Sequence, residues 1–307
     1  MSDAQKKELE QQLWNIADTL RGNMKADDFR DYILGFIFYK YLSEKMESYA
    51  NEILFEDGIF YNDVVGKSDE VQYLQAIKDE SLDKLGYFLR PNELFSEISK
   101  RGSSGAFILE DLTGIFRNIE QTTLGTESED DFVHLFEELD LTSNKLGKTV
   151  QDRNTLIIKV LSHLNKINFD LSNHERDVLG DAYEYLIGKF AAGAGSTAGE
   201  YYTPQQVSKI LAAIVSNGKS RLKSVYDPTC GSGSLLLRVA KSVEEVSNFY
   251  GQEKDPTTYN LARMNMIMHD VHYRKFDLRQ DDTLEHPQHI EQRFEAIVAN
   301  PPFSAKW

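Results

Sequence analysis

Two hydrophobic patterns divide the chain near residue 165. In the first part, apolar residues such as Leu9, Leu13 and Ile16 recur at helical spacing. After residue 220, short β-branched runs alternate with apolar helical runs, which predicts a parallel sheet with helices between its strands. We therefore expect an all-helical domain over residues 1–165 and an α/β domain over residues 166–307.

The helical part is dominated by the segment 29–54, which carries Phe, Tyr, Ile and Leu on more than one face. Such a helix is buried on most sides, so we interpret these aromatic rings as core and not as a base-stacking surface. Residues 122–131 form a polar stretch that predicts a loop. The same spacing predicts further helices at 9–20, 73–78, 93–99, 107–119, 132–139, 156–164 and 178–190.

The α/β part predicts a doubly wound, Rossmann-like sheet. Its expected strands lie at 224–226, 248–251, 276–279 and 296–299, and its expected helices at 235–243 and 256–268. Ligands of such sheets bind beyond the carboxyl ends of the strands, where the strand order switches direction. We therefore expect the ligand-binding and catalytic residues to lie at those strand ends.

The charge, the apolar runs and the cysteine count of the chain exclude several classes of function. The net charge is −15, with 49 acidic residues against 34 Lys and Arg, which argues against strong DNA binding by the chain alone. No apolar run approaches the roughly 18 residues of a membrane span, and the N-terminus lacks an apolar secretory core. The single cysteine, Cys230, excludes an intramolecular disulfide framework and fits a reducing cytosol. A cytoplasmic protein is expected.

Acidic residues follow successive predicted strands. Asp227 ends the first strand and is followed by Gly231 and Gly233, which let a backbone approach a nucleotide-like ligand. Glu253 ends the second strand, where a carboxylate accepts hydrogen bonds from ribose hydroxyls. Asp281-Asp282-Thr283 ends the third. Each acid alone is typical of a solvated surface, but their shared register at the strand ends favours a nucleotide-like site.

The fourth strand ends in Asn300-Pro301-Pro302-Phe303, which suits a planar amino group. The Asn300 side-chain carbonyl and the Pro301 backbone carbonyl can both accept hydrogen bonds from such a group and stabilise the positive charge that develops on its nitrogen. Pro301 and Pro302 lack N–H donors and stiffen the loop, and Phe303 offers a face for stacking a base. We predict that these four residues carry the chemistry.

A glycine-rich stretch, 191–199, precedes Glu200-Tyr201-Tyr202-Thr203-Pro204-Gln205. The stretch predicts a mobile loop. Thr203 is expected to cap a helix whose first residue is Pro204. Two interpretations of Tyr202-Thr203-Pro204 remain open: a simple helix start, or a mobile loop that closes over a ligand at the helix N-terminus.

These motifs, in this order, resemble the S-adenosylmethionine-dependent adenine-N6 DNA methyltransferases. The helical N-terminal part and the stretch 200–205 most resemble the modification (M) subunit of type I restriction-modification systems. The resemblance implies that residues 200–205 and the turn 232–234 surround the methionine part of the cofactor. It also implies that Glu253 binds the ribose and that Asp282 lies near the adenine. The cofactor-binding residues expected on this basis are Glu200, Tyr201, Tyr202, Thr203, Pro204, Gln205, Asp227, Gly231, Ser232, Gly233, Ser234, Glu253 and Asp282.

The same resemblance implies partners. A specificity (S) subunit supplies sequence recognition and most of the grip on duplex DNA, and a restriction (R) subunit and a second M subunit join the complex. The helical domain is expected to contact DNA or the specificity subunit. This family's catalytic domain continues beyond the Asn-Pro-Pro-Phe motif, so the sheet is expected to be C-terminally incomplete and the isolated chain to transfer methyl groups poorly.

Other functions remain open at this point. A protein-glutamine or RNA amino methyltransferase would use the same Asn-Pro-Pro chemistry, and a non-catalytic assembly module would fit a truncated chain. A nicotinamide dehydrogenase would place a third glycine where Leu236 stands. Cys230 is interpreted as a small packing residue rather than a nucleophile. The pairs His269/His272 and His286/His289 are interpreted as surface histidines rather than metal ligands, so no metal is expected.

Overall fold

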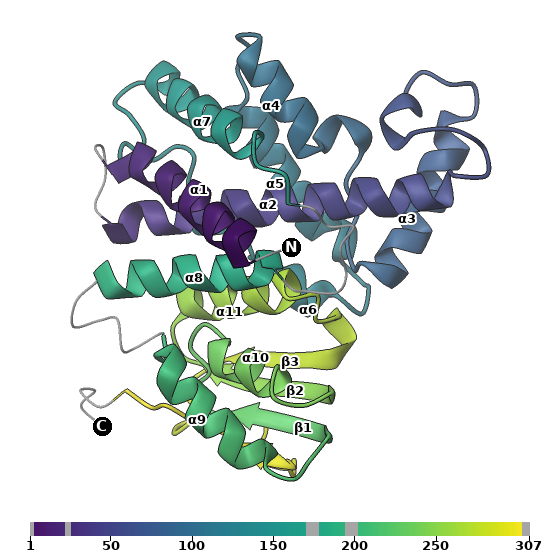
Figure 1. The fold of residues 1–307 in the computed structure, drawn as a ribbon. Coiled ribbons are helices and arrows are strands. Elements are labelled where there is room, and N and C mark those ends of the chain that lie inside the picture. Colours follow the sequence, from purple (N-terminus) through teal and green to yellow (C-terminus); the bar gives the residue numbers. More distant parts are fainter. Residues whose placement is uncertain (1–2, 22–25, 170–177, 194–201, 303–307) are drawn as a thin grey trace. The chain divides into compact units, whose positions relative to one another are not determined.

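The computed structural model describes residues 3–21, 26–169, 178–193 and 202–302. The chain forms two compact units, Met1–Arg176 and Asp177–Trp307. The first is helical and the second contains a parallel sheet with helices, which confirms the predicted fold class (Figure 1). Among the described helices, none combines the length and the apolarity that a membrane span requires.

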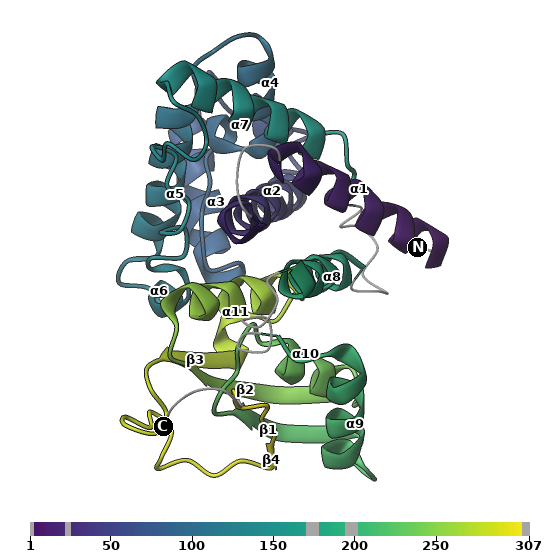
Figure 2. The ribbon, with the colours of Figure 1, turned by 90° about the vertical axis from the view of Figure 1, so that its left-hand side faces the viewer.

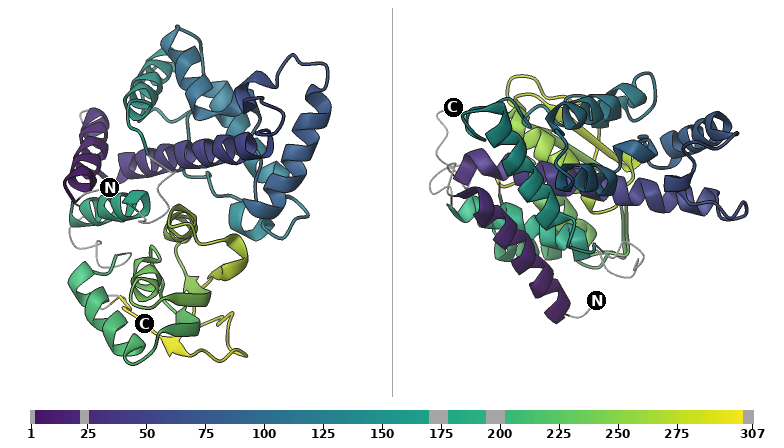
Figure 3. Two further views of the ribbon diagram at one scale, coloured as in Figure 1. Left: turned by 45° about the vertical axis from the view of Figure 1, so that its right-hand side comes forward. Right: turned by 90° about the horizontal axis from the view of Figure 1, so that it is seen from above.

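The helical unit is built around one long helix, α2. In chain order its elements are α1 (Asp3–Arg21), α2 (Ala26–Ile53), α3 (Glu70–Lys84), α4 (Phe95–Ser103), α5 (Leu109–Thr123), α6 (Glu129–Phe132) and α7 (Val150–Leu164), with 3-10 turns at Tyr61–Asp63 and Pro91–Glu93. Helix α2 packs against α1, α3, α4 and α7 (Figure 3).

Aromatic residues of α2 form the centre of this unit. Phe36 and Tyr39 are fully buried, and Phe116 of α5 meets the Tyr39 ring edge-on at 5.5 Å. Phe136 stacks on Phe116 with 4.6 Å between the ring centroids. The interpretation of these rings as core is confirmed, because burial leaves them no face on which a base could stack.

The helix expected over 132–139 is wrong. Helix α6 ends at Phe132, and hydrogen-bonded turns follow it. His134 has a φ of 56°, in the left-handed region that a right-handed helix cannot contain. The apolar side chains that suggested a helix are nevertheless buried, among them Leu135 and Phe136, so tertiary packing satisfies the same spacing with turns.

Within its described residues, the α/β unit contains four parallel strands. Its elements are α8 (Val178–Gly193), α9 (Gln205–Ser216), β1 (Arg221–Asp227), α10 (Ser234–Ala240), β2 (Glu245–Glu253), α11 (Pro256–Met268), a 3-10 turn (Tyr273–Lys275), β3 (Phe276–Gln280) and β4 (Ala296–Ile297). The strand order is β3-β2-β1-β4. The chain therefore runs outward from β1 to β3 and then returns to the other side of β1, which makes the β1–β4 boundary the switch point.

Helices and a loop cover this sheet. Helix α10 packs against α9, α11, β1 and β2, so these three helices lie side by side along the sheet (Figure 2). Tyr226 of β1 and Tyr250 of β2 are paired neighbours, and the loop after β3 packs its Phe294 against both rings, at 4.5 and 5.1 Å. The strand ends are thereby held by packing on both sides of β1 and β2.

Candidate functional site

A glycine turn follows β1 at the carboxyl edge of the sheet. Gly231 and Gly233 have φ values of 54° and 76°, which side chains with a Cβ rarely adopt, and Gly233 directly precedes α10. The Cys230 N–H donates to the Gln252 carbonyl at 3.0 Å, which ties the turn to β2. Cys230 is buried, as expected for a packing residue, and burial raises the pKa of its thiol.

Two carboxyl groups lie beside this turn. Asp227 is buried, and its Oδ1 accepts a hydrogen bond from the Thr229 N–H at 3.0 Å. Burial raises the pKa of Asp227 to about 7, and the negative charge of Glu253 adds to the rise. Glu253 accepts from the Gly231 N–H at 3.0 Å with one oxygen and from the Asp255 N–H at 3.0 Å with the other. The site concentrates acidic groups, which favours a ligand with cationic or hydroxyl groups.

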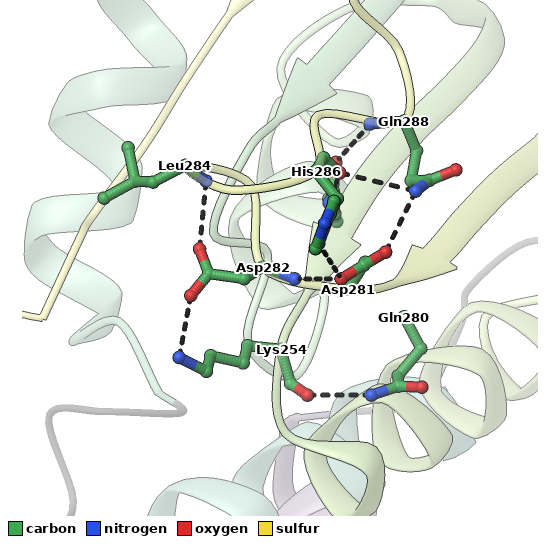
Figure 4. A network of polar contacts seen from close by, with 8 residues as sticks. Lys254, Gln280, Asp281, Asp282, Leu284, His286 and Gln288 are labelled. Atoms are coloured by element: carbon green, nitrogen blue, oxygen red, sulfur yellow. Dashed lines mark hydrogen bonds and ion pairs between the residues drawn. The ribbon is translucent and has the colours of Figure 1, made fainter.

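The loop after β3 is tied to both neighbouring loops. The Asp281 N–H donates to the Glu253 carbonyl at 3.0 Å, and the Thr283 hydroxyl donates to the Pro228 carbonyl at 2.6 Å. Asp282 pairs with Lys254 at 2.7 Å, which lowers the pKa of its carboxyl (Figure 4). The ends of β1, β2 and β3 are therefore connected, as their register in the sequence predicts.

Asn300 reaches the same edge from β4. The Val298 N–H donates to the Tyr226 carbonyl at 2.9 Å and so places β4 along β1. Three residues after Ile297, Asn300 is half-buried, and its Nδ2 donates to the Thr203 hydroxyl at 3.3 Å. Pro301 is exposed and Pro302 is half-buried, whereas Phe303 lies outside the described residues.

The segment before α9 differs from the expectation. Helix α9 begins at Gln205, and Pro204 stands before it with φ −53° and ψ 135°, so Pro204 is not the first helical residue. The Pro204 carbonyl accepts from the Ser208 N–H, which puts Pro204 itself at the cap position. Thr203 lies one residue further out and contacts Asn300 instead of capping. Glu200 and Tyr201 lie outside the described residues.

The glycine turn is also held by Asn265, a residue that was not expected from the sequence. The Ser232 and Ser234 hydroxyls are buried and lie 3.0 Å apart. Asn265 of α11, also buried, donates through Nδ2 to the Ser232 carbonyl at 2.9 Å. The available signal was an amide within the apolar run Met264–Met268.

Gln252 of β2 was also missed. It is fully buried, its Nε2 donates to the His286 carbonyl at 2.9 Å, and its Oε1 accepts from the Gln288 N–H at 3.0 Å. Figure 4 shows the polar contacts of Gln288 with Asp281 and His286 in the same loop. The available signal was a polar side chain directly after the expected strand 248–251 and directly before Glu253.

The histidine interpretation is wrong for two of the four. His269 and His289 are buried, and His289 packs edge-on against Tyr226 and Tyr250. The His289 imidazole packs among aromatic rings in the core. The spacing of the histidines in the sequence does not reveal this burial. Within the part of the chain that the structure describes, no group of three or more metal-ligating residues is found.

Comparison with known proteins finds two family models. Residues 9–164 match the HsdM N-terminal domain, and residues 174–307 match the N-6 DNA methylase domain. The type I restriction enzyme MpnII methylase subunit of Mycoplasma pneumoniae is 36% identical over 99% of this chain and 59% of its own length. The MjaIX methylase subunit of Methanocaldococcus jannaschii is 26% identical over 98% of this chain and 52% of its own length.

A solved structure agrees with these matches. The type I restriction-modification methyltransferase subunit from Streptococcus thermophilus superposes with a TM-score of 0.84 at 38% identity, over 98% of this chain and 64% of that one. The chain thus spans between half and two thirds of the length of these relatives. It belongs to the family of type I restriction enzyme methylase subunits, with an HsdM N-terminal domain followed by an N-6 DNA methylase domain.

Proposed function

We propose that this chain transfers a methyl group from S-adenosylmethionine to the N6 amino group of adenine in duplex DNA, as the methylase subunit of a type I restriction-modification complex. The observation that carries the proposal is the arrangement at the switch point. Asn300 follows β4 beside the end of β1, where Asp227, the glycine turn and Glu253 gather. An acceptor for an amino group thus lies next to strand ends whose polar groups suit a nucleoside.

The residues present fit this cofactor. S-adenosylmethionine carries a cationic sulfonium, an ammonium group and a ribose diol, and the site offers two partly or fully buried carboxyl groups whose pKa values are raised by burial. Gly231 and Gly233 adopt left-handed backbone conformations and add no side chain of their own to the turn. A cationic ligand would stabilise the ionised carboxylates that burial disfavours.

Each candidate residue has a proposed role. Glu253 holds the ribose hydroxyls and Asp282 lies near the adenine. The turn 232–234, Asp227 and the segment 200–205 surround the methionine part. When bound, the cofactor supplies a methyl group on a positively charged sulfur, which is an electrophile that needs no further activation.

The chain's own contribution to the reaction is at Asn300 and the prolines after it. The Asn300 Oδ1 and the Pro301 carbonyl accept hydrogen bonds from the adenine amino group and stabilise the positive charge that grows on nitrogen as it attacks. Phe303 stacks on the extruded base. The matches to DNA methylase domains favour an amino group of DNA over a protein carboxamide or an RNA base as the acceptor.

The partners follow from charge and family. With a net charge of −15, the chain needs a partner for most of the grip on DNA, and we infer that a specificity subunit supplies it together with the target sequence. The helical domain, 1–165, is inferred to contact that subunit or DNA. A restriction subunit and a second methylase subunit complete the proposed complex.

The test is methyl transfer by methylase and specificity subunits expressed together from their native genes. Tritiated S-adenosylmethionine and duplex DNA are supplied, and N6-methyladenine is identified by mass spectrometry. The Asn300→Ala variant is expected to lose methyl transfer while retaining cofactor binding, because the proposed role of Asn300 is to accept hydrogen bonds from the adenine amino group and not to hold the cofactor. Methyl transfer at the wild-type rate by Asn300→Ala, or label found in protein or RNA instead of DNA, would contradict the proposal.

A further inference from the structure

The orientation of the Asn300 amide decides what it offers to an amino group. Its Nδ2 donates to the Thr203 hydroxyl at 3.3 Å. With the NH2 end engaged there, the carbonyl end is directed away from Thr203. A half-turn of the amide would present two N–H donors to a substrate that is itself a donor, and the accepting hydrogen bond would be lost.

Thr203 is held on its C-terminal side by α9. The Ser208 N–H donates to the Pro204 carbonyl at 3.0 Å, and the Ser208 hydroxyl lies 3.3 Å from the Thr203 carbonyl. The pyrrolidine ring of Pro204 fixes its φ, here −53°. The backbone at Thr203 therefore has little freedom on that side.

On its N-terminal side Thr203 is held through Tyr202, which packs against α8 at Gly188. A Cβ added at Gly188 would lie 2.9 Å from the Tyr202 Oη and 3.0 Å from Cζ, so the tyrosine ring would have to shift to make room for it. Glu184, one turn earlier on α8, is buried and pairs with Arg238 of α10 at 3.7 Å. Burial, and then the charge of Glu184, raise the pKa of Tyr202, which agrees with a phenol lying over this face of α8.

We propose that Thr203 is a positioning residue that orients the Asn300 amide, and that Gly188 fixes Thr203 by providing the contact surface for Tyr202. This chain of contacts connects α8, the start of α9 and the end of β4. Only its catalytic consequence rests on the proposed function: the orientation directs the Asn300 carbonyl, as a hydrogen-bond acceptor, toward the substrate amino group. The contacts themselves need neither cofactor nor DNA.

The amide signals of Asn300 in NMR spectra of the 307-residue chain test this directly. Selective labelling with 15N-asparagine shows the side-chain NH2 pairs, and the pair missing from Asn300→Ala identifies Asn300. In Thr203→Val the proton that donates to the hydroxyl is expected to move upfield, because its acceptor is gone. Thr203→Ser keeps the hydroxyl and is expected to restore the wild-type position.

Gly188→Ala tests the second contact, with Gly114→Ala as the matched control. Both glycines lie inside helices, but a Cβ at Gly114 meets nothing within 4 Å. We expect the Asn300 signal to move in Gly188→Ala although Thr203 is intact, and to stay in Gly114→Ala. An unmoved signal in either Thr203→Val or Gly188→Ala, or an equal movement in Gly114→Ala, overturns the proposal. Failure of cofactor binding or methyl transfer would instead refute the proposed function and leave these spectra unaffected.

Discussion

Asp227→Asn is predicted to stabilise the α/β unit at neutral and alkaline pH while weakening its binding of a cationic ligand. The carboxyl of Asp227 is buried and its pKa is raised from 3.8 to about 7, first by burial and further by Glu253. The asparagine oxygen can still accept the hydrogen bond from the Thr229 N–H, so the turn keeps its geometry. The substitution therefore removes the ionisation and little else.

The magnitude follows from the two pKa values. Well below pH 3.8 the carboxyl is protonated in the folded and unfolded chains alike, and it contributes no difference in free energy. As the pH rises, the unfolded chain loses this proton first, so stability falls until the pH passes the folded pKa, near 7. At about 1.4 kcal/mol per pKa unit, a shift of about three units costs about 4 kcal/mol above pH 7, of which about 2 to 3 kcal/mol is lost between about pH 5 and pH 8.

The single cysteine provides the assay. Cys230 is buried in the α/β unit, so its protection from a short pulse of thiol reagent across a urea series reports the unfolding of that unit alone. The stability advantage of Asp227→Asn over wild type should grow by about 2 to 3 kcal/mol between about pH 5 and pH 8. Glu244→Gln removes an exposed acid next to β2 and serves as the control without this growth. An advantage that does not change with pH would refute the argument from burial.

Three further predictions concern packing and capping. Gly251→Ala should destabilise the α/β unit by about 1 to 3 kcal/mol in the same urea series, because its Cβ would lie 2.6 Å from a Leu278 methyl, and Leu278→Ala should restore part of the loss. Asn154→Leu should destabilise the helical unit by about 1 to 3 kcal/mol in thermal melts, because the Ile108 N–H loses its buried acceptor at 2.9 Å; an unchanged melt would show that water replaces it. Thr149→Ala should cost about 1 kcal/mol through loss of the α7 cap, and Thr149→Ser should not.

Much of the fold was predictable because local patterns and tertiary structure agree. The apolar faces of 29–54 made a buried helix the natural expectation, and α2 spans Ala26–Ile53. The runs before Asp227, Glu253 and Asn300 predicted strands whose carboxyl ends meet at one edge, and the sheet order β3-β2-β1-β4 gathers them there. In both cases the period of the hydrophobic residues is sufficient to fix the element.

The errors arise where long-range contacts decide. Phe132, Leu135 and Phe136 have helical spacing, yet the left-handed backbone at His134 ends the helix and turns bury the same side chains. Thr203 has the chemistry of a helix cap, but its hydroxyl contacts Asn300, 97 residues later in the chain.

Buried amides were missed for a related reason. The partners of Gln252 and Asn265 are backbone groups of loops that a single sequence does not bring together. A polar side chain in an apolar segment indicates that a partner exists, but it does not identify the partner.

The proposed binding site for S-adenosylmethionine is the carboxyl edge of the sheet beside β1 and β4, and calorimetric titration of the 307-residue chain measures this binding. We expect S-adenosylmethionine to bind and NAD not to bind. Asp227→Ala should weaken the binding, and Asn300→Ala should leave it unchanged. Absence of binding to the wild-type chain, equal binding of NAD, or loss of binding in Asn300→Ala would contradict the account.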